Sequence, residues 1–447
     1  MNYDSSVRYL LSLGRELAAP IQATTAKFDL ENITILDERL GRPDRAYPSA
    51  HIAGTNGKGS TAAFLESILR RAGFRTGLYT SPHLERINER IRIAGEEISD
   101  DVFAEIFTRI HHLIEELLAT GKLRAHPTYF ECLTAMAFEA FARARVDFAV
   151  FEVGLGGRLD STNVIIPAVT LITPIDFDHE NFLGHSIREI AGEKAGILKP
   201  GVPVVVSPER TEARELILRR AAELGCPVVE TETAFRVEHQ SSEDGCERAL
   251  VTEFASFRQF GVAPRLAGRF QLQNALTAAA AARVLAAHGF RIPDEAVSEG
   301  IAAAEWSGRL EKVHSQPDVY LDGAHNPAAA RELAAFWSQN FAGRKIRLVY
   351  GALREKAVDE IAGLLFPRAA EVVFTEPRTT RAISAAQLAE ITAHHAQRFA
   401  IVPDAEEAFE RVLAEAAPRD AIFVTGSLYL VGQIRRFWKN RTGVLAP

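Results

Sequence analysis

The chain has 447 residues, of which 47% are hydrophobic and 24% are charged, and its formal net charge is -7. This composition indicates a globular protein of two or three domains and excludes the basic surface of a nucleic-acid-binding protein. No apolar run reaches the roughly 18 to 20 residues of a membrane span, and three widely spaced cysteines exclude a disulfide framework. We therefore expect a cytoplasmic α/β protein that binds neither membranes nor nucleic acid.

In the first half of the chain, short apolar runs rich in branched residues alternate with helical patterns. A parallel sheet covered by helices has this signature. The predicted strands are AHIAG (50–54), DFAVFEVG (147–154), AVTLITP (168–174) and VPVVVS (202–207).

The segment from about 231 to 265 interrupts this alternation. Its runs FRVEH and ALVTEF alternate in polarity around the turn-like SSEDGCER, which predicts a hairpin. An alanine-rich helix is predicted next, over residues 271–289, where it ends at a glycine.

A second α/β unit is predicted from near residue 306. The fold class is therefore an N-terminal P-loop-type domain with a mostly parallel sheet (1–304) plus a smaller C-terminal Rossmann-like α/β domain (305–447). The five strands expected in the second unit are DVYLDG (318–323), KIRLVYG (345–351), EVVFTEP (371–377), RFAIV (398–402) and AIFVTGS (421–427).

A glycine-rich stretch, HIAGTNGKGST (51–61), follows the first predicted strand. It departs from the usual G-x-x-x-x-G-K-[ST] loop, because Gly59 separates Lys58 from the hydroxyl residues and Ile52 replaces the first glycine. We predict that its backbone amides and Lys58 bind phosphate, with a helix beginning at Ser60. The alternative is a plain turn in which Ser60 caps the helix. The candidate nucleotide-binding residues here are Gly54, Thr55, Asn56, Gly57, Lys58, Gly59, Ser60 and Thr61.

Seven segments in order carry a more specific signal. They are HIAGTNGKGST, LYTSPHLERINERI (78–91), FEVGLGGRLDSTN (151–163), ITPIDFDHENFLG (172–184), EKAGILKPG (193–201), WSGRLE (306–311) and DGAHNP (322–327). Together they resemble the bifunctional folylpolyglutamate synthase/dihydrofolate synthase family, a branch of the Mur-type ligases. The resemblance runs from about residue 25 to 432.

The resemblance implies ATP-driven amide formation. A carboxylate is phosphorylated to an acyl phosphate, and the amino group of L-glutamate then displaces phosphate. The implied substrates are ATP, L-glutamate and either dihydropteroate or a folate. The implied cofactors are Mg²⁺ at two sites, with K⁺ as a further candidate, and a monomer is expected.

Metal ligands are also implied by the resemblance. Glu152, at the end of a predicted strand, would hold one Mg²⁺ together with Ser60, and His179 would ligate the second with Ser81. From the residues alone, Glu152 and His179 are equally compatible with solvated side chains. Histidine is also an unusual ligand for Mg²⁺, which prefers oxygen.

Lys194, in GEKAGILKP, matches a lysine that is commonly carbamylated in this family. Carbamylation requires a neutral amine, and it turns a cation into an anion that can support the His179 metal site. The alternative is a surface lysine whose stem covers apolar neighbours.

The second domain is expected to complete the ATP site. By resemblance, Arg309 and Asp322 contact the phosphates and ribose, Asn274 contacts adenine, and His325 lies near the transferred phosphate. Without the resemblance, DGAHNP also fits a turn followed by a helix start.

For the pterin we predict Thr128 and Phe130, at a helix start, and Arg86 near its anionic tail. The aromatic Phe130 also fits the core-facing side of a helix. The glutamate subsite is expected near TGSLYLVG (425–432).

Two rival functions stay open at this stage. One is a Mur ligase of cell-wall synthesis, which is disfavoured because the glycine loop begins so early in the chain. The other is a nucleotide switch, which would not need the GRLE and DGAHNP segments. The pattern does not distinguish dihydrofolate synthase from folylpolyglutamate synthase activity.

Overall fold

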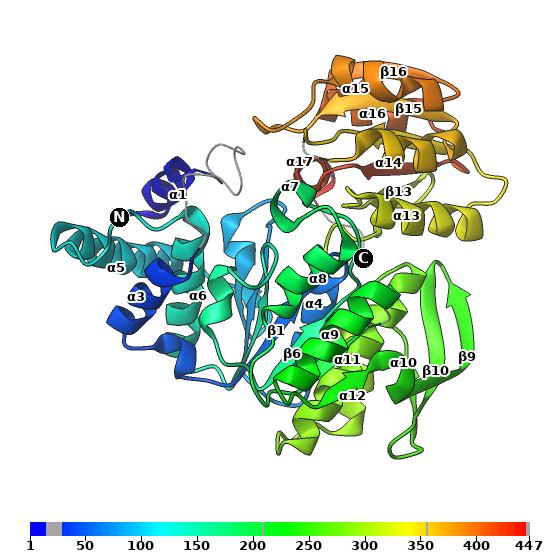
Figure 1. Cartoon of the computed structure of the whole chain (residues 1–447). Coiled ribbons are helices and arrows are strands. Elements are labelled where there is room, and N and C mark those ends of the chain that lie inside the picture. The colour runs from blue at the N-terminus through cyan, green and yellow to red at the C-terminus, as the bar shows by residue number, and fades with distance from the viewer. Residues whose placement is uncertain (15–28, 208–209, 355, 444–447) are drawn as a thin grey trace.

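The computed structural model describes residues 1–14, 29–207, 210–354 and 356–443. Figure 1 shows a large α/β unit, a small antiparallel sheet beside it, and a second α/β unit formed by the last third of the chain. Within the described residues, no helix is both long and apolar enough to cross a membrane.

The large unit is built on an eight-stranded sheet with the order β4-β3-β2-β5-β1-β6-β7-β8. In the run β2-β5-β1-β6-β7-β8 each strand is parallel to the next, whereas β3 pairs with both β2 and β4 in an antiparallel manner at one edge. The four strands predicted from the first half of the chain are confirmed. The strands are β1 (Ser49–Ala53), β2 (Thr76–Tyr79), β3 (Ile91–Ile93), β4 (Glu96–Glu97), β5 (Phe148–Glu152), β6 (Val169–Ile172), β7 (Val204–Val206) and β8 (Val228–Glu230).

Helices cover both faces of this sheet. One face carries α4 (Lys58–Arg71), α11 (Arg269–Ala287) and α12 (Asp294–Ala303). The other face carries α1 (Tyr3–Ser12), α3 (Glu31–Leu40), α5 (Asp100–Ala119), α6 (Tyr129–Ala144), α8 (Ile187–Ala195) and α9 (Thr211–Glu223). Shorter turns of helix are α7 (Glu180–Leu183), α10 (Thr231–Ala234), η1 (Pro43–Arg45), η2 (Ile87–Arg90) and η3 (Ser161–Val164).

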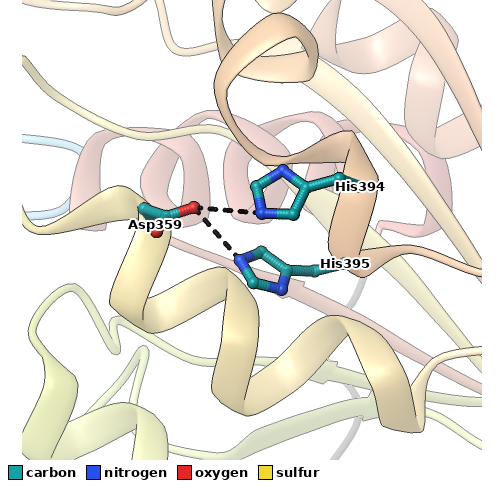
Figure 2. Close-up of side chains that lie close together, drawn as sticks. All are labelled: Asp359, His394 and His395. Atoms are coloured by element: carbon teal, nitrogen blue, oxygen red, sulfur yellow. Dashed lines mark hydrogen bonds and ion pairs between the residues drawn. The ribbon is translucent and has the colours of Figure 1, made fainter.

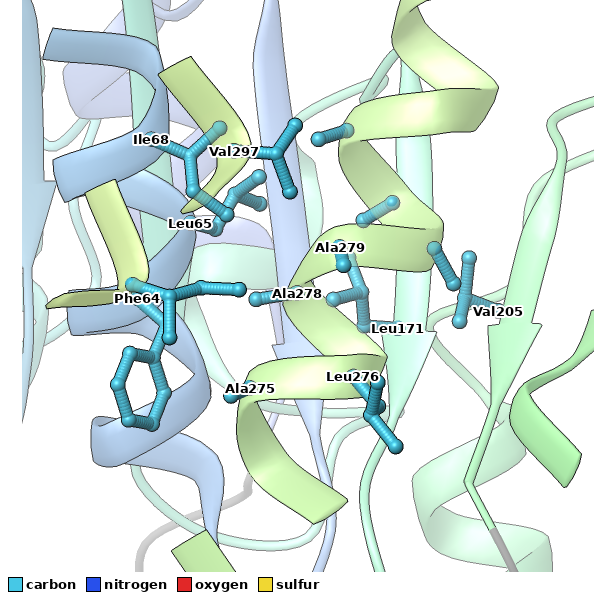
Figure 3. Packing of buried hydrophobic residues seen from close by; sticks show 14 of the residues in the cluster. Phe64, Leu65, Ile68, Leu171, Val205, Ala275, Leu276, Ala278, Ala279 and Val297 are labelled. Atoms are coloured by element: carbon cyan, nitrogen blue, oxygen red, sulfur yellow. The ribbon is translucent and has the colours of Figure 1, made fainter. Parts of the chain in front are cut away.

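Strand β5 shows why both faces are apolar. Successive side chains of a strand point to opposite faces, so Phe148 and Val150 pack with α4 and α11 while Ala149 and Phe151 pack with α5 and α6. The alanines of α11 let that helix lie close to α4 and the sheet, as Figure 3 shows.

The small sheet contains β9 (Phe235–Glu243), β10 (Cys246–Glu253) and β11 (Gln259–Val262), in the order β11-β10-β9. The predicted hairpin is confirmed, but its turn is much tighter than the predicted SSEDGCER. Asp244 and Gly245 both have positive φ, which suits a two-residue turn and lets the flanking polar residues join the strands. Strand β11 was not predicted.

The second α/β unit has a six-stranded sheet with the order β12-β13-β17-β14-β15-β16. The five predicted strands are confirmed, and they pair in parallel, whereas β12 is an additional antiparallel edge strand. The strands are β12 (Glu311–His314), β13 (Asp318–Leu321), β14 (Ile346–Tyr350), β15 (Glu371–Glu376), β16 (Phe399–Asp404) and β17 (Ala421–Thr425).

Helices cover both faces of this second sheet as well. On one face lie α13 (Pro327–Asn340), α14 (Val358–Leu365) and α15 (Ala385–Thr392), and on the other α16 (Ala405–Glu415) and α17 (Leu428–Thr442). The turns η4 (Phe366–Arg368) and η5 (Ala393–His395) follow α14 and α15. The chain passes between the two units after α12 and before β12, and the predicted boundary at residues 304 and 305 stays a prediction.

Candidate active site

A cleft of about 900 Å³ lies where the two units meet. Its walls come from the loops that follow β1, β2, β5 and β6 on one side, and from the loop after β13, the start of α13 and Leu428 on the other. The carboxyl ends of parallel strands are where open α/β sheets bind ligands. Here two such edges face one another, with room for a nucleotide and a second substrate.

Most of the predicted site residues line this cleft. The structure brings together Gly54, Thr55, Asn56, Gly57, Lys58, Gly59, Ser60, Ser81, Glu152, His179, Lys194, Asn274, Arg309, Asp322 and His325. The roles assigned to them by resemblance stay predictions.

The glycine loop joins β1 to α4. The helix begins at Lys58 rather than at Ser60, so the predicted start was wrong. Gly57 is the N-cap with φ of 84°, and a Cβ there would lie 2.4 Å from Oδ1 of Asn274. Glycine is therefore required at this turn, and the turn places Lys58 and Gly59 in the first helical turn. The first amides of a helix have no acceptor within it, so they suit an anion.

The loop is also packed against the segment that links the two units. A Cβ on Gly59 would lie 2.8 Å from the indole nitrogen of Trp306. The guanidinium of Arg92 lies over the same indole ring, 5.4 Å from its centroid.

Lys58 folds back over the loop. Its Nζ donates hydrogen bonds to the carbonyl oxygens of Gly54 (3.0 Å) and Thr55 (3.1 Å). Its burial lowers the pKa of Lys58, and the nearby Glu152 acts in the opposite direction. The ammonium group is thereby positioned at the loop, as phosphate binding requires.

Glu152 lies at the end of β5 and is buried. Burial raises its pKa, while the charge of Lys58 and the hydrogen bond from the Ser81 amide to Oε2 (3.0 Å) lower it. The Ser60 hydroxyl is close to α11, where it accepts a hydrogen bond from Gln271 Nε2 (3.3 Å). Ser81 therefore contacts Glu152 directly, and its pairing with His179 stays a prediction.

Asp178 and Lys356 are site residues that sequence reasoning missed. Lys356 Nζ lies 2.7 Å from Oδ1 of Asp178 and 3.4 Å from Nε2 of His179. His325 Nε2 lies 3.6 Å from the other oxygen of Asp178. The four side chains form a charged group that spans the two units. Asp178 stands beside His179 in the quoted DFDHE, whereas no motif marks Lys356.

Electrostatics within this group are set by burial and by its single carboxylate, that of Asp178. Burial would raise the pKa of Asp178, but the hydrogen bond with His325 and the charge of Lys356 outweigh it and hold that pKa well below its usual range. Burial lowers the pKa of His179 to about 3, so its imidazole is neutral at neutral pH. Burial also lowers the pKa of His325. A neutral imidazole is the form that ligates metals.

Asn326 connects the glycine loop to the second unit. Its Nδ2 donates to Oδ1 of Asn56 (2.9 Å) and to Oδ2 of Asp178 (3.2 Å), and its Oδ1 accepts from Asn56 Nδ2 (3.3 Å). The same Oδ1 caps α13 by accepting from the amide of Ala329. This residue lies inside DGAHNP but was not singled out from the sequence.

Lys194 is on α8 and is only 4% exposed. The alternative of a surface lysine is therefore wrong. Its Nζ donates to the carbonyl oxygen of Gly54 at 2.7 Å, so it reaches the glycine loop. Its carbamylation stays a prediction.

Asp322 fixes the turn that presents Arg309. Its two carboxylate oxygens accept from the amides of Leu310 and Ala324, each at 2.9 Å. Burial raises the pKa of Asp322, and the neighbouring Arg309 opposes that shift. Arg309 lines the cleft from the second unit.

Four predicted residues lie outside the lining of the cleft. Thr61 is buried in α4, and its hydroxyl has no hydrogen-bond partner within the part of the chain that the structure describes. Thr128 is exposed and caps α6. Arg86 is exposed and pairs with Asp100. Phe130 packs behind the cleft, where a Cβ on Gly154 would lie 2.6 Å from its ring.

Two family models match the chain. Residues 52–282 match the Mur ligase middle domain, and residues 308–428 match the Mur ligase glutamate ligase domain. The matched regions contain the two faces of the cleft.

Similar curated proteins are dihydrofolate synthase/folylpolyglutamate synthases. The protein of Bacillus subtilis is 37% identical over 401 residues, covering 89% of this chain and 92% of that one. The protein of Escherichia coli is 32% identical over 426 residues, with 93% and 92% covered.

Solved structures are similar over almost the whole chain. A Mycobacterium tuberculosis folylpolyglutamate synthase complexed with ADP has a TM-score of 0.87 at 33% identity, covering 98% of this chain and 99% of that one. An E. coli FolC in complex with DHPP and ADP has a TM-score of 0.83 at 29% identity, covering 99% and 98%.

Proposed function

The chain belongs to the folylpolyglutamate synthase/dihydrofolate synthase family of Mur ligases, and from this premise we propose how its cleft works. It is an ATP-dependent ligase that joins L-glutamate to a folate-type carboxylic acid. The rival functions, a cell-wall ligase and a nucleotide switch, have no support beyond the shared superfamily. We propose that one cleft serves both dihydropteroate and folylpolyglutamates as acceptors.

The observation that carries the proposal is that residues from both α/β units line one cleft and would together form the ATP site. Lys58 and the first-turn amides of α4 face Arg309 and His325 from the second unit. Phosphoryl transfer needs positioning and charge stabilisation rather than covalent chemistry from the protein. A cleft with cations from two domains supplies both when it is closed.

The reaction has two steps. An oxygen of the acceptor carboxylate attacks the γ-phosphorus of ATP, the bond to the β-phosphate oxygen breaks, and ADP leaves. The neutral amine of L-glutamate then attacks the acyl carbon, the amide C–N bond forms, the C–O bond to phosphate breaks, and the amine gives up a proton. Lys58 and Arg309 would stabilise the negative charge that moves in the first step.

Two Mg²⁺ ions fit the donors present. Ser60 and Glu152 would hold one, and His179 with Ser81 would hold the second. A bound Mg²⁺ neutralises charge on the phosphates. Glu152 supplies the hard oxygen donor for Mg²⁺, and Asp178 beside His179 supplies a second carboxylate that the sequence did not indicate. Carbamylation of Lys194 would add an anion beside the loop.

The test is glutamate-dependent phosphate release with Mg²⁺-ATP and one acceptor per reaction, either 7,8-dihydropteroate or a monoglutamyl tetrahydrofolate. Release with both supports the proposal, and release with one assigns a single activity. No release with either acceptor, in protein that binds ADP, would contradict the proposed acceptors. Repeating the assay in KCl and in NaCl tests K⁺. Sedimentation tests the expected monomer.

A further inference from the structure

The second α/β unit carries two imidazoles and a carboxylate that converge at its surface, outside the lining of the cleft. Figure 2 shows ring nitrogens of His394 and His395 facing one oxygen of Asp359. We propose that these three residues form a binding site for a divalent transition-metal ion of the Zn²⁺ class. This proposal does not depend on the ligase reaction.

The spacing of the donor atoms fits such an ion. Nε2 of His394 lies 3.7 Å from Oδ1 of Asp359, and Nε2 of His395 lies 3.1 Å from the same oxygen. Zn–N and Zn–O bonds of about 2.0–2.1 Å at tetrahedral angles place two ligand atoms about 3.3 Å apart. The two measured separations lie on either side of that value. All three candidate ligand atoms are within 4.8 Å of one another.

Packing between helices brings the donors together. Asp359 is in the first turn of α14, and the two histidines form the end of η5, directly after α15. The His395 ring lies against Gly363 of α14, where a Cβ would be 3.4 Å from its Cε1. The side chains of Asp359 and His394 are each 62% exposed, while that of His395 is 26% exposed. Three protein donors with an open side leave room for water or another ligand as the fourth.

The donor set separates this site from the magnesium chemistry of the cleft. Imidazole suits Zn²⁺, Ni²⁺ and Cu²⁺, whereas Mg²⁺ prefers oxygen donors and gives up its water reluctantly. The start of a helix disfavours a cation. At the start of α14 that effect is opposed by two carboxylates, those of Asp359 and Glu360.

The competing explanation is a plain contact that holds η5 against α14, with a histidine donating to Asp359. Such a contact needs only one histidine, and it predicts no ion. Direct measurement of bound metal separates the two explanations.

The experiment is equilibrium dialysis of the full chain against Zn²⁺ in excess Mg²⁺ and ADP, with bound zinc counted by mass spectrometry. We expect H395A and H394A to bind about one Zn²⁺ fewer per chain, or to bind it at least about tenfold more weakly, than the unaltered protein. The variant His185→Ala is the matched control, because its imidazole is exposed and forms an ion pair only with Glu180 among the described residues, with no second histidine beside it. It should bind as much Zn²⁺ as the unaltered protein.

A second measurement, the Co²⁺ absorption spectrum, separates loss of the metal site from loss of the fold. The isosteric Asp359→Asn keeps the shape of the site and removes the anionic donor, so Co²⁺ should lose the visible d–d absorption of its tetrahedral form. Circular dichroism confirms the fold of each variant. Equal zinc content in the unaltered protein, H394A and H395A, together with an unchanged Co²⁺ spectrum in D359N, would overturn the proposal.

Discussion

His51 lies fully buried in β1, and its protonation state follows from its neighbours. The Thr162 hydroxyl donates to Asp160 and therefore accepts from Nε2 of His51, at 2.8 Å. Nδ1 has no partner among the described residues. The ring is therefore neutral, because a second N–H would be buried without an acceptor. Burial, with the charge of Lys199, lowers the pKa of His51 to about 3.

The depressed pKa predicts a pH dependence of stability. Unfolding returns His51 to an ordinary pKa near 6.5, so its contribution is fully present above pH 6.5 and is lost as the pH falls toward 3. One extra proton taken up on unfolding costs about 1.4 kcal/mol per pH unit. Urea unfolding from pH 7.5 to 5 should therefore show H51Q losing about 2 kcal/mol less than the unaltered protein. Parallel losses in the two proteins would contradict the assignment. His179 adds a similar dependence to both.

The replacement of Lys58 separates catalysis from stability. Because Lys58 is half-buried and desolvation lowers the pKa of its ammonium, Lys58→Met should not reduce the free energy of unfolding. It should reduce kcat for glutamate-dependent phosphate release by about 10²–10³, as the loss of one charge-stabilising donor does. The control is Lys312→Met, on β12 and outside the cleft lining, which should leave kcat unchanged. An active K58M enzyme would remove Lys58 from the phosphate site.

The sequence predicted site residues where they lie in a motif of neighbouring residues. The glycine loop, Glu152 and DGAHNP were found because each motif follows a strand, and strand ends meet at the cleft. Lys356 was missed because its position depends on β14 lying beside β17 in the second sheet, and on the two units closing. Neither is encoded in the residues around it. The hydroxyl of Thr128 caps α6, and the contact of this residue with the pterin stays a prediction.

At the scale of elements, the start of α4 depends on the backbone of one glycine. Gly57 has φ of 84° and is crowded by Asn274, whereas Gly73, just after the same helix, has φ of 94° and open space around it. The two positions have similar φ angles at opposite ends of the helix, and they differ in how closely other side chains approach.

Replacing each glycine by alanine should therefore have unequal effects. Both substitutions place a Cβ in the left-handed region, at about 1–2 kcal/mol. Gly57→Ala must also displace Asn274, which adds about 1–3 kcal/mol, and it should weaken ATP binding. Urea unfolding and nucleotide titration of the two variants measure both effects. Equal destabilisation, with unchanged ATP affinity, would show that the loop accommodates a side chain.

Two of the strands missed from the sequence, β11 and β12, share a physical cause. Strands β11 and β12 have four residues each and pair in an antiparallel manner at the side of a sheet. An edge strand needs no long apolar run, because one of its sides faces solvent. Most of the buried parallel strands were found, since burial on both faces leaves a continuous apolar run. The buried parallel strand β2 was missed, because its residues TGLY (76–79) form no such run.

At the scale of the molecule, ion pairs of two kinds join the units. Lys356 and Asp178 meet with side chains that are 6% and 11% exposed. Arg331 and Asp176 meet at 3.0 Å, but the arginine side chain is 43% exposed. A buried pair is costly to break because the remaining charge loses its partner, whereas an exposed pair is screened by water.

This contrast predicts how the two contacts respond to mutation. Lys356→Gln should lower the free energy of unfolding by about 3 kcal/mol, and it should raise the pKa of Asp178 by removing the nearby cation. Arg331→Gln should cost about 0–1 kcal/mol. Urea unfolding of both variants tests the stabilities. A larger loss of unfolding free energy in R331Q than in K356Q would show that the buried pair is not the stronger contact between the two units.

The packing of Trp306 against the glycine loop has a practical consequence. The chain has three tryptophans, and Trp337 and Trp438 are 2% and 5% exposed in the core of the second unit. Only Trp306 lies where the two units and the loop meet, with Arg92 over its ring. Its fluorescence emission should therefore shift when a nucleotide enters or the units separate, while the other two give a constant background. The protein thus carries an intrinsic optical reporter of its own closure.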